Sequence, residues 1–143
     1  MPIILPDNNL REIPFIIFSE LRKVASRKKH PFKNVVLTTV KEQTPLSRWV
    51  VFRKLTIEQN LLVYSDVRSE KIKNLRKNPN CGLLFYNNRQ GLQIYFSTVS
   101  TIHQKNELTK KYWQGIVGKS SENYTNVNPP GSPINSIDKG HKT

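Results

Sequence analysis

Five short segments with the composition of β-strands follow one another between residues 34 and 102, and they constrain the fold more than any other feature. Each is rich in β-branched or aromatic residues and is bounded by residues that favour turns, as at 41–45 and 87–91. The predicted strands are Asn34–Val40, Arg48–Lys54, Asn60–Tyr64, Gly82–Tyr86 and Leu92–Ile102. Such a series predicts a mainly β, α+β fold, consistent with a small barrel flanked by helices.

Three helices are predicted beside these strands. The first runs from Pro14, which fits a first helical turn, to about Arg27. Its apolar stripe at helical spacing consists of Phe15, Phe18, Leu21, Val24 and Ala25. A second, short helix follows a cap at Ser65–Asp66 and ends before Asn78-Pro79, and a third covers Lys105–Ile116.

The length of 143 residues gives room for one domain with a single core. We expect a loose leader over residues 1–13, the folded domain over 14–117 and an extended or disordered tail over 118–143, where Gly, Ser, Asn and Pro dominate. No stretch approaches the roughly 20 apolar residues of a membrane helix, and the N-terminus lacks the pattern of a signal peptide. The sequence therefore predicts a soluble, cytoplasmic protein.

The net charge of +13 favours anionic partners, such as nucleic acid, a membrane surface or phosphorylated small molecules. The single cysteine, Cys81, excludes an internal disulfide and a multi-cysteine metal site, and its apolar neighbours indicate a small buried residue. His30, His103 and His141 have no metal-ligand spacing and are expected at the surface, so no metal site is predicted. The sequence contains no Gly-rich phosphate loop and suggests no Ser-His-Asp arrangement.

The segment from Tyr64 to Lys71 is the first candidate site. A predicted strand runs into a hydroxyl-rich turn with Ser65 and Ser69, and a short helix follows whose start carries Arg68 and Lys71. Free backbone N–H groups at a helix start, the positive end of its dipole and two cations together form an anion site. The alternative is ordinary capping by Ser65 or Asp66, with the cations facing solvent.

Two predicted strands add further candidates. Arg48 and Arg53 enclose four large apolar residues on one strand, and their odd spacing points them to opposite faces unless a bulge re-aims one of them. As an alternative, both are rim residues of the sheet. Gln93 alternates with apolar neighbours and could reach the polar edge of a ring ligand, although an exposed glutamine on an outer face is the simpler interpretation.

These features, in this order, resemble the pyridoxamine 5′-phosphate oxidase-like FMN-binding split barrels, in a subfamily that opens with a helix and a Lys/His-Pro-Phe exit. The likeness covers roughly residues 14–134. It rests on Arg27-Lys28-Lys29-His30-Pro31-Phe32, Leu37-Thr38-Thr39-Val40, Pro45 with Arg48, Val50, Val51 and Arg53, Tyr64-Ser65-Asp66 with Arg68, Ser69 and Lys71, Asn78-Pro79, Leu83-Leu84-Phe85-Tyr86, Leu92-Gln93 and Tyr112-Trp113.

The resemblance implies a six-stranded split barrel, usually a homodimer, with FMN in the groove between subunits. By position, Arg48, Ser65 and Lys71 would contact the FMN phosphate, with Arg68 as a helper. The wider set of implied cofactor contacts is Arg48, Val50, Val51, Arg53, Tyr64, Ser65, Arg68, Ser69, Lys71 and Gln93. Within that set Val50 and Val51 would flank the isoalloxazine ring through their backbone, and Gln93 would reach the ring from a later strand.

Several positions depart from the family pattern. Where pyridoxamine-phosphate oxidases hold the substrate phosphate with Arg, this chain has Ile116, which argues against vitamin B6 phosphates as substrates. Arg53 stands for their substrate-facing Lys, and their Tyr corresponds to Tyr112, so these two are candidate substrate contacts. Relatives continue for tens of residues past this end, so the C-terminal part of the barrel is expected to be missing.

Three functions remain open from the sequence. The first is an FMN-dependent oxidoreductase, oxidase-like, whose catalytic residues and substrate the sequence does not identify. The second is a catalytically idle flavin-binding module, such as a truncated paralogue. The third is a basic nucleic-acid-binding protein, disfavoured because Tyr95 and Phe96 are adjacent and cannot share one face of a strand as a stacking platform.

Overall fold

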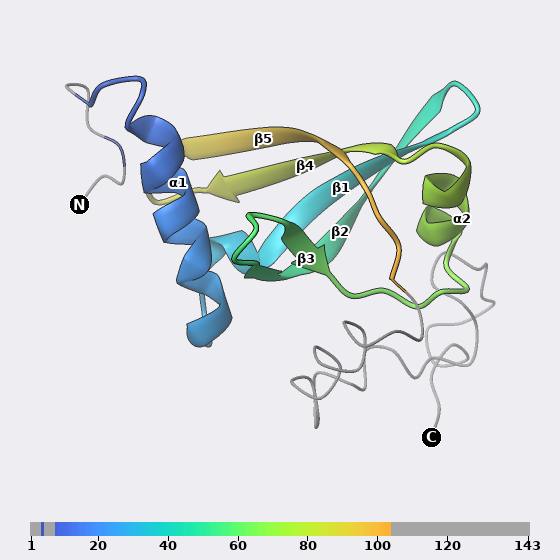
Figure 1. Cartoon of the computed structure of the whole chain (residues 1–143), viewed down its shortest axis with the longest axis horizontal. Helices are drawn as coiled ribbons and strands as arrows, with labels where there is room; N and C mark the ends of the chain where they lie inside the picture. Colours follow the sequence, from blue (N-terminus) through green and yellow to red (C-terminus); the bar gives the residue numbers. More distant parts are fainter. Residues whose placement is uncertain (1–3, 5–7, 104–143) are drawn as a thin grey trace. The chain divides into compact units, whose positions relative to one another are not determined.

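The computed structural model describes residue 4 and residues 8–103, and all structural statements below concern this part of the chain. It contains five strands and two α-helices (Figure 1). The elements in chain order are α1 (Ile13–Arg22), two short 3₁₀ helices (Val24–Ser26 and Pro31–Lys33), β1 (Asn34–Lys41), β2 (Thr44–Leu55), β3 (Leu61–Val63), α2 (Glu70–Lys77), β4 (Asn80–Asn87) and β5 (Leu92–Val99). The predicted mainly β, α+β class is confirmed.

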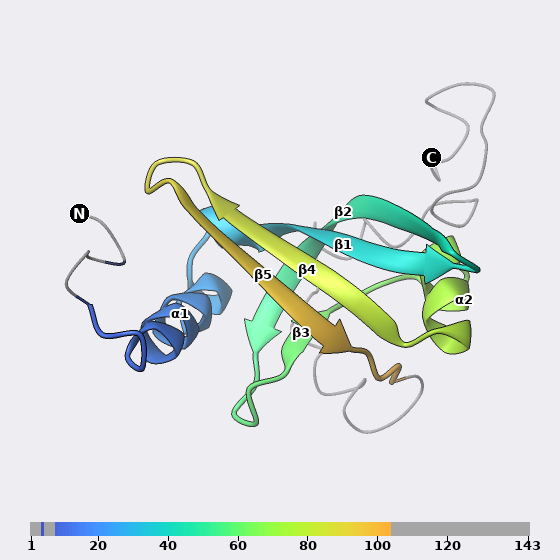
Figure 2. The same ribbon diagram turned by 90° about the horizontal axis from the view of Figure 1, so that it is seen from above.

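The five strands form one sheet in the order β3-β2-β1-β4-β5 (Figures 1 and 2). β1 pairs antiparallel with β4, with Val36 opposite Leu84 and Thr38 opposite Gly82. β2 pairs antiparallel with β3, and the register shifts between Phe52 and Lys54. A sixth strand, which the resemblance implies, is not among the described residues.

The chain divides into two compact units. The described residues of the first unit belong to Met1–Thr38, Pro45–Tyr64 and Gly82–Thr98. Those of the second unit belong to Thr39–Thr44, Ser65–Cys81 and the chain from Val99 onward. The first unit therefore holds α1 and most of the sheet, and the second holds α2 with the β1–β2 turn.

The core of the first unit lies on one face of the sheet. Its centre is the ring of Phe85, which makes edge contacts with Phe32, Phe52 and Phe96 at centroid distances of 5.6, 5.2 and 5.7 Å. α1 covers this face through Phe18, whose ring stacks on Phe96. Alternation along the strands explains the arrangement, because every second side chain of a strand points to the same face.

The first helix is shorter than the sequence indicates. α1 ends at Arg22, and a 3₁₀ turn at Val24–Ser26 follows. Pro14 lies in the first turn, as predicted. Leu21 and Val24 are fully buried, but Phe15 is 73% exposed, so its place in the predicted apolar stripe is wrong. Ala25, the last predicted member of the stripe, is exposed as well, because it lies in the 3₁₀ turn beyond the end of α1.

The strand boundaries also differ from those expected. The predicted turn at 41–45 contracts to Glu42 and Gln43, with Glu42 at a φ of 58°, so β2 begins at Thr44. β5 ends at Val99 and does not reach Ile102. At the other hairpin Gly91 takes a φ of 61°, a conformation that glycine adopts without steric cost. Among the described residues no helix is long and apolar enough to cross a membrane.

Candidate functional site

A tight turn precedes α2 in the second unit. The backbone N–H of Ser69 donates to the carbonyl of Asp66 at 3.0 Å, and that of Arg68 donates to Asp66 Oδ1 at 2.8 Å. The hydroxyls of Ser65 and Ser69 then lie 3.2 Å apart. Ser69, not Ser65 or Asp66, occupies the N-cap of α2, so the predicted cap position is wrong. The Asp66 carboxylate shapes the turn instead, because its oxygen accepts a backbone N–H two residues on.

Arg68 forms a bidentate pair with Asp66. Its Nη2 lies 2.7 Å from Oδ2 and its Nε lies 3.0 Å from Oδ1. The hydrogen bond from Arg68 lowers the pKa of Asp66 below 3.8, against an opposing effect of burial. The sequence motif suggests two available cations at the start of α2, Arg68 and Lys71. The positive charge there is smaller than the motif suggests, because the Asp66 carboxylate binds Arg68.

Lys71 lies in the first turn of α2 and is half-buried. Its neighbour Glu70 forms an ion pair with Lys41 on β1, with 3.3 Å between Oε1 and Nζ. In the part of the chain that the structure describes, the segment before α2, its first two residues and the ion-pair partner on β1 contribute three cations and two carboxylates to the helix start: Lys41, Arg68 and Lys71, with Asp66 and Glu70. Three positive charges less two negative charges leave one positive charge at this end of α2, where the helix dipole is also positive.

Buried contacts hold α2 against the end of β1. Asn74 Nδ2 donates to Thr39 Oγ1 at 3.2 Å, and the two residues are 3% and 0% exposed. Ile72 and Leu75, the pair whose helical spacing predicts the helix, are both buried. The helix start that carries Lys71 is therefore fixed within the second unit by one buried polar contact and two apolar side chains.

The other sequence-predicted residues lie in the first unit. Arg48 on β2 is half-buried, and its Nη1 donates to the carbonyls of Leu37 and Leu46 at 3.2 and 3.0 Å. These bonds hold the guanidinium beside β1 and β2 in one orientation. Charged hydrogen bonds of this kind are stronger than those between neutral groups, so Arg48 is a fixed cation of the sheet.

Arg53 lies at a β-bulge, the feature that would allow it to leave the face given by simple alternation. Phe52 pairs with Val63 but Lys54 pairs with Leu62, so two steps on β2 match one step on β3. The guanidinium carbon of Arg53 lies 5.5 Å from the centroid of the Tyr64 ring. The bulge thus directs Arg53 along β2 towards the residue that follows β3.

The proposed contacts of the ring do not all lie on one face of the sheet. Val50 is buried with Phe52 on the core face, whereas Val51 is half-buried on the opposite face. Gln93 is exposed on β5 and alternates with the buried Ile94. Tyr112 and Ile116, together with the predicted helix 105–116 and the tail 118–143, lie outside the described residues.

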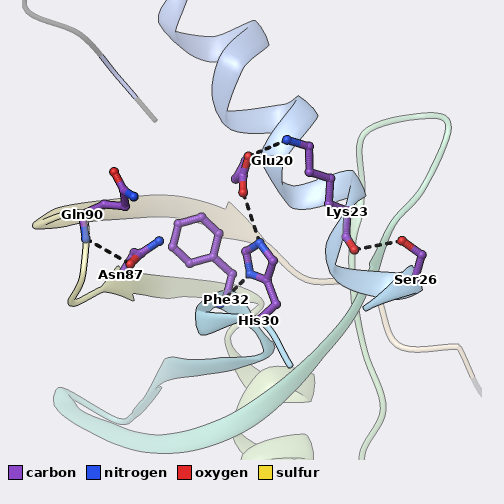
Figure 3. A network of polar contacts seen from close by, with 7 residues as sticks. All are labelled: Glu20, Lys23, Ser26, His30, Phe32, Asn87 and Gln90. Atoms are coloured by element: carbon purple, nitrogen blue, oxygen red, sulfur yellow. Dashed lines mark hydrogen bonds and ion pairs between the residues drawn. The ribbon is translucent and has the colours of Figure 1, made fainter. Parts of the chain in front are cut away.

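The burial of two residues, His30 and Cys81, differs from the prediction. His30 is buried, not at the surface, and its ring joins Glu20 to the backbone of Phe32 (Figure 3). The same network continues from Glu20 to Lys23 at 3.1 Å (Figure 3). Cys81 is half-buried instead of buried. The His30-Pro31-Phe32 motif could have indicated that His30 is buried. The hydrogen-bond partner of His30, Glu20, is ten residues away, and no local pattern in the sequence links the two residues.

Comparisons with known proteins agree on the family and the fold. The sequence model of the pyridoxamine 5′-phosphate oxidase, FMN-binding domain matches residues 17–104, a range that includes all the predicted FMN contacts. The comparison with curated proteins gives no match.

Three solved structures illustrate the shared fold. A pyridoxamine 5′-phosphate oxidase-related, FMN-binding protein from Nostoc punctiforme PCC 73102 is 17% identical, with a TM-score of 0.67 over 90% of this chain and 69% of that one. PhzG from Burkholderia lata 383, in complex with tetrahydrophenazine-1-carboxylic acid, is 19% identical, with a TM-score of 0.63 over 78% and 56%. General Stress Protein 26 from Bacillus anthracis str. Sterne is 22% identical, with a TM-score of 0.57 over 82% and 81%. The predicted split-barrel fold class is confirmed.

Proposed function

This chain belongs to the pyridoxamine 5′-phosphate oxidase FMN-binding domain family, and on that premise we propose that it is a flavoprotein whose FMN phosphate is bound by Arg48, Ser65, Arg68 and Lys71. The proposal goes beyond family membership because it assigns individual residues of this chain to the phosphate. Ser69 is included as the second hydroxyl of the same turn.

The observation that carries the proposal is the pair of hydroxyls at the start of α2. Ser65 Oγ and Ser69 Oγ lie 3.2 Å apart, immediately before a helix whose first turn carries Lys71. Hydroxyl donors, an ammonium group and the unbonded N–H groups of a helix start are the donors that a phosphate dianion accepts. The chemistry of this donor set therefore fits the headgroup of FMN.

Arg68 has a conditional role in this site. Its guanidinium is already bound to Asp66 through Nε and Nη2. A guanidinium carries five N–H groups, so it can hold a carboxylate on one side and still donate to a phosphate from another. We therefore assign Arg68 a weaker share of the phosphate binding than Lys71.

The isoalloxazine ring is proposed to contact Val50 and Val51 through their backbone, with Gln93, Arg53 and Tyr64 as further contacts. Val51 and Gln93 support this assignment because both lie on the sheet face that is opposite the core. Arg53 is also proposed as a substrate contact, together with Tyr112. No catalytic residue is assigned.

For activity we propose an FMN-dependent oxidoreductase that works as a homodimer with the flavin between subunits. When bound, FMN supplies the hydride and electron chemistry, and this chain's residues bind and orient it. The substrate stays unassigned, and Ile116 argues against vitamin B6 phosphates.

The test is an absorbance spectrum of the purified full chain after desalting. We expect a flavin spectrum, and we expect Lys71→Ala to lose at least about tenfold in FMN affinity because a charge-assisted contact to the phosphate is removed. Lys73→Ala is the matched control, because Lys73 is an exposed lysine of the same helix. A colourless protein that does not bind added FMN, or equal affinities for wild type and Lys71→Ala, would contradict the proposal.

A second measurement separates an enzyme from an idle flavin module. Under anaerobic conditions reduced nicotinamide should bleach the bound flavin, and oxygen should restore its colour. Tightly bound flavin that no nicotinamide reduces would leave the binding site in place and remove the proposed oxidoreductase activity.

A further inference from the structure

Residues 22–33, which we call the basic segment, run from the end of α1 to the start of β1 and carry six cations and no carboxylate. The cations are Arg22, Lys23, Arg27, Lys28, Lys29 and Lys33. Lys33 is half-buried, and the other five are exposed. The whole segment belongs to the first unit. None of the six is among the flavin contacts proposed above, so their concentration here needs a separate explanation.

The basic segment is fixed to the core, so its cations are held on a defined surface. Val24 and Phe32 are fully buried, and His30 Nδ1 accepts a hydrogen bond from the backbone N–H of Phe32 (Figure 3). Lys33 Nζ donates to the carbonyl of Lys28 at 3.0 Å, which closes the loop between these two residues. A partner therefore meets the cations without first having to order the backbone that carries them, and this lowers the entropy cost of binding.

The described part of the chain supplies little negative charge to the basic segment. Glu20 binds Lys23 at 3.1 Å, but the side chain of Glu20 is only 15% exposed. No described carboxylate forms an ion pair with the other exposed cations of the segment, Arg22, Arg27, Lys28 and Lys29. In the second unit, by contrast, Lys41 and Arg68 each have a carboxylate partner. The positive charge of the basic segment is thus largely uncompensated.

The dipole of α1 accounts for only part of this charge. Arg22 lies in the last turn of α1 and Lys23 is the C-cap, where the negative end of the helix stabilises cations. Arg27, Lys28 and Lys29 lie beyond the 3₁₀ turn that follows. Because the effect of a helix dipole falls off within the last turn, it gives these three cations no structural role.

A seventh cation comes from the turn between β4 and β5. β1 and β4 are antiparallel, and their register, continued to the start of β1, places Asn34 opposite Tyr86. The turn that follows β4 therefore lies beside the end of the basic segment (Figure 3). This turn carries Arg89, which is exposed and forms no ion pair with another described residue. We call the basic segment together with Arg89 the basic surface.

We propose that the basic surface binds the phosphate backbone of double-stranded DNA, an activity separate from flavin binding. A DNA duplex carries one negative charge per about 1.7 Å of its axis, so a short surface with several cations meets several phosphates at once. Each cation that binds a phosphate releases counterions condensed on the duplex, and this release drives binding that is independent of base sequence. The inference does not depend on bound FMN.

The other side chains of the basic segment favour duplex DNA over other nucleic acids. Single strands are bound through aromatic side chains on which bases stack, but the ring of Phe32 is buried. Double-stranded RNA is recognised largely by contacts to its 2′-hydroxyl groups and by its shape. Ser26 is the only hydroxyl side chain of the segment, and its Oγ already donates to the carbonyl of Lys23 at 3.1 Å. Cations on a fixed backbone, without groups that read bases or ribose, suit the backbone of DNA.

An anionic membrane is a poorer partner for the same reason. Segments that bind a membrane surface place large apolar side chains beside their cations and bury them among the lipids. The two large apolar residues of the basic segment, Val24 and Phe32, are fully buried in the protein. The segment therefore offers charge alone, which a polymer of closely spaced phosphates matches best.

The first test is fluorescence anisotropy of a labelled DNA duplex of about two helical turns, titrated with the full chain. We expect the logarithm of the binding constant to fall linearly with the logarithm of the KCl concentration. The slope should be about −4 to −5, the value for roughly five phosphate contacts. A duplex of the same length and another base sequence should bind with a Kd within about twofold, because contacts to phosphates carry no sequence information.

Two double variants of equal net charge separate the basic surface from the charge of the whole chain. Lys28→Gln/Lys29→Gln removes two charges from the basic surface. Lys73→Gln/Lys77→Gln removes two charges from exposed positions of α2, in the second unit. We expect the first variant to raise the Kd for the duplex at least about tenfold and to reduce the salt slope by about 2, and the second to change the Kd less than about twofold. Circular dichroism checks that both variants fold.

Further probes decide between the basic surface and its alternatives. Equal losses in the two double variants, or no binding of the duplex at low salt, would overturn the inference. Tighter binding of single-stranded DNA or of duplex RNA of the same length would overturn the choice of DNA duplex, as would binding only to vesicles of phosphatidylserine and phosphatidylcholine. A protein that binds the duplex through Lys28 and Lys29 but binds no FMN keeps the basic surface and removes the flavin site. A yellow protein that does not bind the duplex does the reverse.

Discussion

The Nε2 atom of His30 lies 3.2 Å from Oε1 of Glu20, so a residue of the loop before β1 contacts the last turn of α1 (Figure 3). The other ring nitrogen, Nδ1, accepts a hydrogen bond from the backbone N–H of Phe32 at 3.1 Å. Because that N–H can only donate, the ring proton sits on Nε2 and is donated to the Glu20 carboxylate. The side chains of His30 and Glu20 are 3% and 15% exposed, so the bond to Phe32 is buried and the bond to Glu20 is partly buried.

Replacing His30 should therefore destabilise the first unit, and the loss should be smaller when the new side chain keeps one of the two hydrogen bonds. We expect His30→Ala to lower the free energy of unfolding by about 2–3 kcal/mol, because a cavity forms and two buried polar groups lose a partner. His30→Asn keeps an acceptor near the Phe32 N–H and should lose only about 1 kcal/mol. Urea denaturation measures both, with the exposed His103 as the site of a control alanine substitution. Equal losses for the two His30 variants would mean that the Phe32 bond contributes nothing.

The acid stability of the protein should depend on Glu20. Burial raises the pKa of Glu20, but the hydrogen bonds with Lys23 and His30 and the charge of Lys23 outweigh burial, so its pKa lies below its ordinary value. A carboxyl group whose pKa is lower in the folded state stabilises the fold above its unfolded pKa and loses that contribution as the pH falls. The free energy of unfolding should thus decrease as the pH falls below about 4.5.

The matching variant is Glu20→Gln, which cannot ionise. Its unfolding free energy should change less than that of the wild type between pH 6 and the acid range, when urea denaturation is repeated across about three pH units. Glu12→Gln is a control, because Glu12 is an exposed carboxyl group just before the same helix. If the unfolding free energy of Glu20→Gln falls with decreasing pH as steeply as that of the wild type, Glu20 is not the source of the acid dependence.

For the described strands and for α1 and α2, local patterns in the sequence predicted the elements but not their ends. Alternation and turn residues identified all five strands, because both signals depend on neighbours within a few positions. Phe15 was misplaced because helical spacing alone does not show which side of a helix meets the sheet. The β1–β2 turn was expected to be longer because the φ of 58° at Glu42 has no signal in a residue that rarely adopts it.

For the candidate site, the sequence predicted which residues gather at the start of α2 but not which ion pairs they form. The hydroxyls and cations around α2 were visible as a motif, and Ser65 and Ser69 do lie together. That Asp66 binds Arg68 depends on the shape of a turn, and that Glu70 binds Lys41 depends on contacts between elements distant in the chain. Neither ion pair follows from spacing, which is why the sequence overstates the charge available to a phosphate.

The contact between Asn74 and Thr39 should be a coupled pair. Both residues are buried, and Asn74 Nδ2 donates to Thr39 Oγ1 at 3.2 Å. We expect Asn74→Ala and Thr39→Val each to lower the free energy of unfolding by about 1–2 kcal/mol, with a coupling of about 0.5–1.5 kcal/mol in a double-mutant cycle followed by urea denaturation. Additive losses would show that the hydrogen bond contributes no stability of its own.

Gly82 should be sensitive to the side chain of Tyr95. A methyl group at Gly82 would lie within 3.0 Å of three atoms of the Tyr95 side chain. Gly82→Ala should therefore cost about 1 kcal/mol of unfolding free energy, since an overpacked site must displace its neighbour. In a Tyr95→Ser background the same change should be neutral or stabilising by up to about 1 kcal/mol, because alanine loses less backbone entropy than glycine. An equal cost in both backgrounds, measured by urea denaturation, would locate the clash in the backbone.

Asp66 should limit the affinity of this chain for FMN, because it neutralises a proposed phosphate ligand. Its carboxylate binds Arg68 at 2.7 Å and also accepts the Arg68 backbone N–H. Asp66→Asn keeps an oxygen for the backbone bond and removes the negative charge, so the turn before α2 should persist while the repulsion of a phosphate falls. We expect the Kd for FMN to decrease by about three- to tenfold, the effect of one carboxylate charge at a partly exposed site.

Salt and a second variant separate this electrostatic effect from a change of shape. The gain in Asp66→Asn should shrink as ionic strength rises, because salt screens interactions between exposed charges. Asp66→Ala removes the charge together with the acceptor of the Arg68 backbone N–H, so it should gain less affinity than Asp66→Asn. Fluorescence titration with FMN measures all three proteins. Weaker binding in Asp66→Asn at every salt concentration would show that Asp66 serves the site by holding Arg68 in place and that its negative charge does not limit the affinity.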